Sequence, residues 1–133
     1  ELWIRADGST AHLCVFDPAS GGLKSACTGT PQGLSATSTW ARGQAWGIYG
    51  FTLAYRYTHD ASYLRFAEEV ARFFLAGTPI TLIPKWDFNA TAPEDFDDTS
   101  AAAITAAALL ELCVFTGRRW YRDAAVQMIH SIG

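Results

Sequence analysis

The sequence predicts an all-α fold made of stacked helical hairpins behind a short irregular segment. Apolar residues recur every three to four positions in four stretches after residue 38, which is the spacing of one helix face. A second pattern repeats at a constant offset of 58 residues, so that Thr58, Tyr63 and Ala67 recur as Thr116, Tyr121 and Ala125. A sequence repeat with a period of this length predicts helical hairpins that stack on one another, either as an open solenoid or as a closed α/α toroid.

The composition is that of one globular domain, which we expect to span residues 1–133. Half of the residues are hydrophobic and 17% are charged, so the chain is too apolar to be disordered. The net charge of −3 argues against nucleic acid as a partner, because a nucleic-acid surface needs a basic face. No apolar run approaches the ~20 residues of a membrane span. No signal peptide is visible, which favours a cytoplasmic location.

Both ends of the sequence look cut. It opens on Glu1 rather than on a methionine and stops directly after a helical pattern. Two helical hairpins alone would also leave apolar faces uncovered. We therefore expect this chain to be the middle of a longer protein, and to be inactive by itself.

Residues 1–38 are expected to form loops and one hairpin. Residues 11–17 are typical of a short strand, and Asp17-Pro18 followed by Gly21-Gly22 is typical of a hairpin connection. Residues 28–38 are rich in Gly, Ser and Thr, which predicts a loop.

The three cysteines form neither an even disulfide framework nor a spacing that would bind a metal. Cys14 and Cys27 could pair across the predicted hairpin. The sequence nevertheless favours free, part-buried thiols for these two and for Cys113. We expect no metal site.

Residues 39–133 are expected to form two helical hairpins. Ser38 or Thr39 can cap a helix that runs to about residue 57, and Asp60 can cap a second helix that ends at Gly77. A third helix should begin at Asp98 or the next residue and run to about residue 116. A fourth should occupy residues 119–132.

Residues 78–97 contain three prolines and are predicted to form a long loop, a length that is typical of functional segments. The loop ends in the acidic run Glu94, Asp95, Asp97 and Asp98. Paired carboxylates could do acid–base work. Because the run directly precedes a helix, capping of that helix is the favoured interpretation.

The densest chemical signal lies at the start of the first predicted helix. Arg42 and Trp46 are four residues apart and should be neighbours on one helix face. A guanidinium can hold a carboxylate with two hydrogen bonds while an indole stacks on the apolar face of a sugar. The same pair could equally form a cation–π contact inside a helix bundle. Glycines at positions 43, 47 and 50 predict a close approach of another segment or a ligand.

Two polar side chains in the irregular region are further candidates. Gln32 could hydrogen-bond sugar hydroxyls, since it offers both a donor and an acceptor, although a loop glutamine is more often only solvated. His12 lies on the predicted strand and, by its position alone, is more typical of a structural histidine.

These residues carry a resemblance to a known family. The motif from Gln32-Gly33 through Ser38–Phe51 is similar to the signature of the unsaturated glucuronyl hydrolases, glycoside hydrolase family 88. The later elements follow in the family's order, namely Tyr63-Leu64, Pro84–Phe88 and Asp98–Ala103. Upstream, Asp7–Thr10 with His12 is similar to the family's preceding segment.

The resemblance implies a fragment of a six-hairpin (α/α)6 barrel whose substrate is an oligosaccharide ending in a 4,5-unsaturated uronic acid. Such enzymes hydrate the C4–C5 double bond with an aspartate as general acid and base, without a cofactor. The matching positions imply that His12, Gln32, Arg42 and Trp46 bind the substrate, with Trp40 as a further candidate. The family's catalytic aspartates lie upstream of this chain, so the resemblance implies no catalytic residue here.

Pro31, Ala36, Thr37 and Lys85 depart from the family pattern, which leaves the fine substrate specificity open. Two alternatives to the glucuronyl hydrolase remain. One is the related unsaturated rhamnogalacturonyl hydrolase, which typically has Asn-Gly-Trp where this chain has Gln44-Ala45-Trp46. The other is a non-catalytic helical-repeat module that binds a partner in its groove. The oligomeric state is not predicted.

Overall fold

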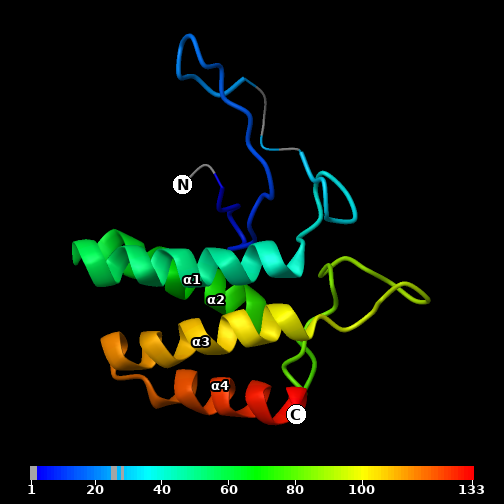
Figure 1. Ribbon diagram of the computed structural model, residues 1–133, viewed down its shortest axis with the longest axis vertical. Coiled ribbons are helices and arrows are strands. Elements are labelled where there is room, and N and C mark those ends of the chain that lie inside the picture. Colours follow the sequence, from blue (N-terminus) through cyan, green and yellow to red (C-terminus); the bar gives the residue numbers. More distant parts are fainter. Residues whose placement is uncertain (1–2, 25–26, 28) are drawn as a thin grey trace.

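Four helices arranged as two hairpins make up most of the chain. The computed structural model describes residues 3–24, 27 and 29–133. The helices are α1 (Ala41–Thr58), α2 (Ala61–Gly77), α3 (Thr99–Thr116) and α4 (Arg119–Ile132). α1 packs against α2, α3 packs against α4, and the two hairpins meet where α1 contacts α3. The N-terminal ends of α1 and α3 lie at the same end of the bundle, as does the loop that joins α2 to α3 (Figure 1).

The core lies where the four helices meet. Its buried side chains include Ile48 of α1, Phe74 of α2, Leu109 of α3 and Met128 of α4. α3 is long and apolar enough to cross a membrane by length and composition alone, so the expectation that no apolar stretch approaches that length is wrong for this helix. Seven of its residues are buried. A helix that is apolar all round is typical of a protein core as well as of a membrane span.

The 58-residue repeat predicted from the sequence is confirmed. α1 and α3 begin at residues 41 and 99 and end at residues 58 and 116. The residue after each helix, His59 or Gly117, has left-handed backbone with φ of 57° or 69° and caps the helix end. Thr58 and Thr116 each donate a hydroxyl hydrogen bond to the carbonyl four residues earlier. The two hairpins therefore share their turn geometry as well as their sequence pattern.

Two of the three predicted helix caps are confirmed. The Asp60 carboxylate accepts a hydrogen bond from the backbone of Ser62, and the Asp98 carboxylate accepts one from the backbone of Ala101. The predicted cap at Ser38 or Thr39 is wrong, because the N-cap of α1 is Trp40, whose side chain makes no capping bond.

The start of α1 is held instead by the distant loop between α2 and α3. Ala41 N–H donates to the carbonyl of Trp86 at 2.9 Å, and Phe88 N–H donates to the carbonyl of Thr39 at 2.9 Å. The hydroxyl of Ser38 donates to the carboxylate of Asp87 rather than to the helix. Backbone pairing between segments far apart in sequence thus replaces the local cap.

The N-terminal segment is less regular than predicted. The strand expected over residues 11–17 is wrong, because only isolated bridges form there, Leu13 with Gly29 and Phe16 with Leu23. A two-stranded hairpin without a third strand or a covering helix sustains little regular pairing. The hairpin connection itself is confirmed, since Asp17 N–H donates to the carbonyl of Gly22 at 2.8 Å. Residue 28 of the predicted loop 28–38 lies outside the described residues, as do residues 1, 2, 25 and 26 of the predicted segment 1–38.

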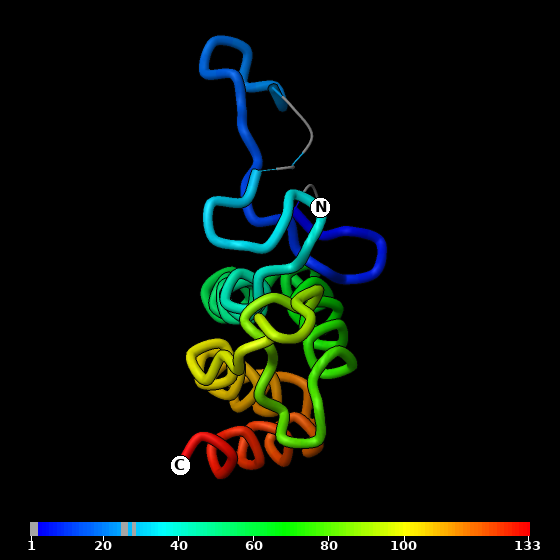
Figure 2. The backbone as a smooth tube through the Cα atoms, turned by 90° about the vertical axis from the view of Figure 1, so that its right-hand side faces the viewer, coloured from blue at the N-terminus to red at the C-terminus, as the bar shows by residue number. Residues whose placement is uncertain are grey.

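Residues 13–24, 27 and 29, here named the disulfide arm, extend away from the helices (Figure 2). Cys14 and Cys27 form a disulfide across this arm, and Cys113 is free. The expectation of three free thiols is therefore wrong. The hairpin connection at residues 17–22 brings the two cysteines opposite each other, a closeness that their spacing in sequence does not fix.

A buried glutamine fastens the N-terminal segment to the helices. Gln44 is fully buried, and its side-chain oxygen accepts a hydrogen bond from the backbone of Thr10 at 2.7 Å. Its amide nitrogen donates to the carbonyls of Gly8 and Val70 at 2.9 and 3.0 Å. One amide group thus joins α1, α2 and the segment before the disulfide arm.

We expect Gln44→Ala in the full-length protein to lower the free energy of unfolding by about 3 kcal/mol, because it leaves buried backbone groups without partners and opens a cavity. The measurement is urea denaturation followed by circular dichroism. Gln32→Ala, which removes the same side chain from an exposed loop position, is the control and should leave the midpoint unchanged. Equal midpoints for the two variants would contradict the anchoring role of Gln44.

The disulfide is expected to survive in the purified protein. Trypsin cleaves after Arg5, Lys24 and Arg42, so it places the two cysteines in separate peptides, residues 6–24 and 25–42. After denaturation and digestion without reductant, mass spectrometry should find these peptides joined. Reductant should separate them. Two free peptides without reductant, after free thiols have been blocked, would rule out the disulfide.

Candidate functional site

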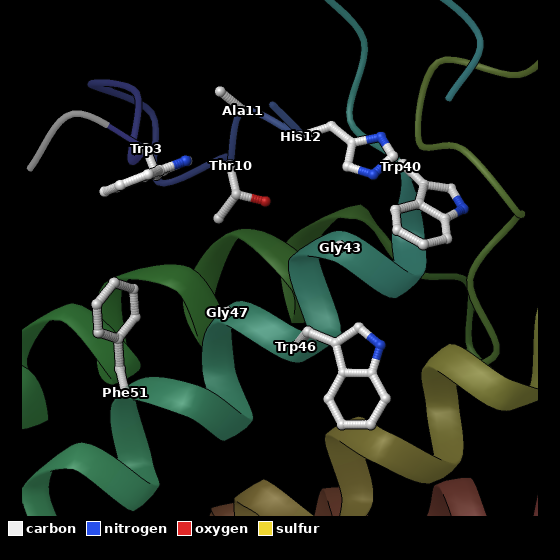
Figure 3. A pocket seen from close by; sticks show the side chains of 9 residues that line it. All are labelled: Trp3, Thr10, Ala11, His12, Trp40, Gly43, Trp46, Gly47 and Phe51. Atoms are coloured by element: carbon white, nitrogen blue, oxygen red, sulfur yellow. The ribbon is translucent and has the colours of Figure 1, made fainter. Parts of the chain in front are cut away.

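A groove of about 360 Å³ runs along the first half of α1 beneath the N-terminal segment. A volume of this size suits a small ligand. Three tryptophans, a phenylalanine and a histidine contribute to its walls, with small residues between them (Figure 3). The lining residues of this aromatic groove are Trp3, Thr10, Ala11, His12, Trp40, Gly43, Trp46, Gly47 and Phe51.

Two of the three glycines of α1 allow the groove's walls to approach the helix. A Cβ atom on Gly47 would lie 3.2 Å from Thr10 and 3.3 Å from Val70, and one on Gly43 would lie 3.0 Å from the ring of Trp40. Contacts this short would push the neighbours away. The close approach predicted from the sequence is confirmed at these two positions. A Cβ on Gly50 would meet nothing within 4 Å, so no described neighbour requires a glycine there.

His12 and Trp40 form one end of the groove. Their rings stack with centroids 4.5 Å apart and an interplanar angle of 29°. The His12 Nδ1 atom forms a hydrogen bond of 3.1 Å with the hydroxyl of Thr30, in which the donor depends on the imidazole tautomer. The Thr30 hydroxyl also accepts a bond from the Gly33 backbone at 2.8 Å. The orientation of the imidazole is therefore set from two sides.

Arg42 contacts a different tryptophan from the one expected. Its guanidinium carbon lies 5.2 Å from the ring centroid of Trp40, whereas Trp46 packs edge-on against Tyr49 at 5.9 Å. Trp40 precedes the helix, and its ring folds back over the first turn, next to Arg42. Arg42 also lies 3.5 Å from a carboxylate oxygen of Asp98. A cation–π contact therefore exists, while the Arg42 side chain stays 41% exposed and able to reach a ligand.

The structure brings the four predicted site residues to one region but not into one cavity. His12 and Trp46 line the aromatic groove. Arg42 lines a neighbouring hollow with Trp86, Glu94 and Phe96. Gln32 is exposed, and the next residue, Gly33, approaches Trp40 so closely that a Cβ there would lie 3.3 Å from that side chain. Trp40 therefore contacts His12 and Arg42 directly, shares the aromatic groove with Trp46 and lies near the residue that follows Gln32.

A buried aspartate organises the loop next to Gln32. Asp87 is fully buried, and its carboxylate accepts hydrogen bonds from the backbone of Leu34 at 2.9 Å and the hydroxyl of Ser38 at 2.8 Å. The other oxygen accepts one from the backbone of Asn89 at 3.0 Å. Sequence reasoning missed this role, although Asp87-Phe88-Asn89 carries the spacing of a local turn in which an aspartate binds the backbone two residues on.

The acidic run has structural rather than catalytic geometry. Capping is confirmed for Asp98. Asp95 instead pairs with Lys85 at 2.9 Å, and the hydrogen bond from that ammonium group lowers the pKa of Asp95. Within the ranges that the structure describes, no three His, Cys, Asp or Glu side chains gather as a metal site would require.

No family model matches the chain, but individual proteins do. An unsaturated glucuronyl hydrolase of Formosa agariphila is 42% identical over 97% of this chain and 32% of its own length. One of Bacillus sp. GL1 is 46% identical over 82% of this chain and 29% of its own length. The chain belongs to the unsaturated glucuronyl hydrolase family. It spans about a third of the length of these curated relatives.

A solved structure in this family has the same fold over the shared segment. The unsaturated glucuronyl hydrolase of Bacillus sp. GL1, described as responsible for the degradation of glycosaminoglycan, superposes with a TM-score of 0.90 at 41% identity. The match covers 97% of this chain and 35% of that one. The α/α-barrel class that the sequence predicted is thereby confirmed.

We expect Asp87→Ala in the full-length protein to lower the free energy of unfolding by about 2 to 4 kcal/mol, because it deprives three donors of a buried charged partner. Thermal unfolding by circular dichroism measures the loss. Asp95→Ala, which removes a carboxylate from the surface of the same loop, is the matched control. It should leave the midpoint unchanged, since surface ion pairs contribute little. A similar loss in both variants would contradict the special role of Asp87.

Proposed function

We propose that the full-length protein hydrolyses oligosaccharides ending in a 4,5-unsaturated glucuronic acid, and that this chain supplies much of the site that holds the uronate. The observation that carries the proposal is the convergence on Trp40. His12 stacks on its ring, Arg42 lies against it, and the aromatic groove that it lines also contains Trp46. Family membership makes the unsaturated uronate the natural ligand for this arrangement.

The chemistry of the ligand fits these side chains. A 4,5-unsaturated uronate is flattened around its double bond and carries a carboxylate on C5. The Trp46 ring is 52% exposed and can stack on the flat ring of the sugar. Arg42 presents five N–H donors in a planar fork, and its contact with Asp98 at 3.5 Å leaves donors for a carboxylate.

In the proposed reaction, an aspartate outside this chain protonates C4 and activates a water that adds its oxygen to C5. The resulting hemiketal opens to a ketone at C5, and the hemiacetal then left at C1 breaks to release the neighbouring sugar. His12 uses Nδ1 to bind Thr30, so Nε2 is the ring nitrogen left to contact the substrate near the reacting carbons. No metal or cofactor enters these steps.

The aspartates of the N-terminal half do not suit the acid's role. Hydrogen bonds from Ser9 lower the pKa of Asp7, one from the Ala19 backbone lowers the pKa of Asp17, and one from the Ser62 backbone lowers the pKa of Asp60. A general acid works best with a pKa near the working pH. These shifts support the expectation that the catalytic aspartates lie elsewhere in the full-length protein.

The activity is tested with the full-length protein and an unsaturated glucuronyl disaccharide made by a polysaccharide lyase. Hydration removes the conjugated double bond, so ultraviolet absorbance should fall as the sugar is released. Persistent absorbance with every unsaturated glucuronyl substrate would show that the proposed activity is wrong.

We expect Arg42→Ala to lower kcat/KM by an amount equivalent to about 2 to 4 kcal/mol, because the substrate carboxylate loses a charged partner in a desolvated site. Arg42→Lys keeps the charge but loses the planar fork and should also reduce activity. Arg72→Ala, which removes an exposed guanidinium from α2, is the control. Since Arg42→Ala also leaves Asp98 without its ion-pair partner, thermal stability is measured in parallel. A folded Arg42→Ala variant with near wild-type kcat/KM would make the residue structural only.

Trp46→Ala should cost less, about 1 to 3 kcal/mol in kcat/KM, by analogy with aromatic stacking on other flat ligands. The matched control is Trp120→Ala, which removes a similarly exposed indole from α4 at a position outside the groove. Unchanged kcat/KM for Trp46→Ala, or an equal loss for Trp120→Ala, would contradict a stacking role.

A further inference from the structure

The base of the disulfide arm is closed by three successive cross-links. The first is the 3.1 Å hydrogen bond between His12 and Thr30. The second is the backbone bridge between Leu13 and Gly29. The third is the disulfide between Cys14 and Cys27. The covalent link is thus only two residues along the chain from the histidine that lines the aromatic groove.

Beyond this base the arm is held weakly. Among its described residues, further backbone bonds include those from Asp17 N–H to Gly22 and from Lys24 N–H to Val15, each of 2.8 Å. The Phe16 ring also lies 5.7 Å from that of Trp3. Leu13, Val15, Phe16 and Leu23 are all exposed, and the arm extends away from the helices (Figure 2). An isolated two-stranded hairpin is marginally stable in water. The disulfide therefore holds together a hairpin whose described residues make few stabilising contacts of their own.

His12 lies at the boundary between this arm and a firmly held segment. Two residues before it, the backbone of Thr10 is fixed by the buried side chain of Gln44, and Ala11 N–H donates to the carbonyl of Trp3 at 2.8 Å. After it the chain enters the arm and returns at Thr30, the residue that orients the imidazole. The position of Thr30 depends on the return path of the arm, which the disulfide closes, and on the bond that its hydroxyl accepts from the Gly33 backbone.

We propose that Cys14 and Cys27 are positioning residues, whose disulfide keeps the His12 imidazole in place in the aromatic groove. The proposal deepens the proposed function and rests on it, since it makes the activity of the substrate site depend on whether Cys14 and Cys27 are oxidised to a disulfide. Reduced protein should be folded but poorly active. Loss of the disulfide lets the arm separate at its base and Thr30 moves away, so that the His12 ring keeps its stacking on Trp40 but loses the hydrogen bond that sets its orientation.

The redox step is an ordinary thiol–disulfide exchange. A dithiol such as dithiothreitol supplies two electrons and two protons. The S–S bond of Cys14 and Cys27 breaks, two thiols form, and the reductant closes to its own cyclic disulfide. Both cysteine side chains are half-buried, so a small reductant can reach them.

The first experiment measures kcat/KM of the full-length protein on one unsaturated disaccharide before and after dithiothreitol. We expect a fall of about 10- to 100-fold, because small displacements of an active-site group have effects of this size. The double variant Cys14→Ser/Cys27→Ser should show the low value with or without reductant. Cys113→Ser, which removes the free thiol of α3, should respond as the wild type does.

A set of variants tests whether reduction of the disulfide lowers kcat/KM because it displaces His12. In His12→Ala, reduction should cause no further loss, because the side chain that the disulfide positions is already absent. In Trp46→Ala, which also alters the groove, reduction should still lower kcat/KM by the full wild-type factor. An equal response in His12→Ala and in the wild type would mean that the disulfide supports the fold only, and would overturn the proposal.

A second measurement is independent of activity. Diethyl pyrocarbonate modifies accessible imidazoles, and the tryptic peptides 6–24 and 57–65 report His12 and His59 separately. Modification of His12 should be several-fold faster in Cys14→Ser/Cys27→Ser than in the wild type, and modification of exposed His59 should be unchanged. If His12 responds but no unsaturated substrate is consumed, the proposed function fails while the positioning role stands. If the enzyme is active and neither measurement responds, the positioning role is wrong.

Discussion

The pairing between the start of α1 and the distant loop at residues 86–88 is the constraint on which the site depends. The two backbone hydrogen bonds that join Ala41 to Trp86 and Phe88 to Thr39 hold the start of α1 in place of a capping side chain. They also fix the backbone of Trp40, which lies between the paired residues and bridges to Asp87. Since His12 and Arg42 contact the Trp40 ring, which also leaves no room for a side chain at Gly43, the position of this one residue decides the shape of the candidate site.

A second constraint acts from the opposite wall of the groove. The side-chain amide of Gln44 holds the segment that carries Thr10, and the absence of a side chain at Gly47 lets that segment approach α1. Because Gln44 is fully buried, its side chain cannot contact a substrate in the groove. The Gln44-Ala45-Trp46 element therefore combines one structural residue with one exposed indole. The two differences from the Asn-Gly-Trp typical of the rhamnogalacturonyl hydrolases fall on Gln44 and Ala45, which are both buried.

These contacts separate the buried polar residues, which have structural roles, from the exposed residues of the candidate site. Polar groups that are buried, such as Gln44 and Asp87, are bonded to the backbone and build the walls. Side chains that remain partly exposed, such as Arg42 and Trp46, are free to bind. The disulfide arm adds a covalent element to the wall that carries His12. A chain that spans about a third of the length of its relatives thus holds the residues of the candidate site, and the proposed acid–base chemistry belongs to residues elsewhere.

Local signals in the sequence determined the helices. Asp60 and Asp98 bind backbone groups two or three residues away, and Gly117 adopts the left-handed backbone that ends α3, so each acts within one turn of itself and can be recognised without the fold. The 58-residue repeat is likewise a property of the sequence alone. The resemblance to the family was also present in the sequence, because its long motif is continuous.

Only the tertiary structure decided the cap of α1, the aromatic partner of Arg42 and the state of Cys14 and Cys27. Ser38 looks like a cap by its neighbours, but it donates to Asp87, 49 residues away. Arg42 meets Trp40 rather than Trp46, because the pairing at the helix start directs the first ring and helical spacing alone does not. The cysteines pair because a hairpin turn brings them opposite each other. In each case the contact joins groups that are distant in sequence or placed by a distant segment. A pattern of neighbouring residues therefore cannot predict it.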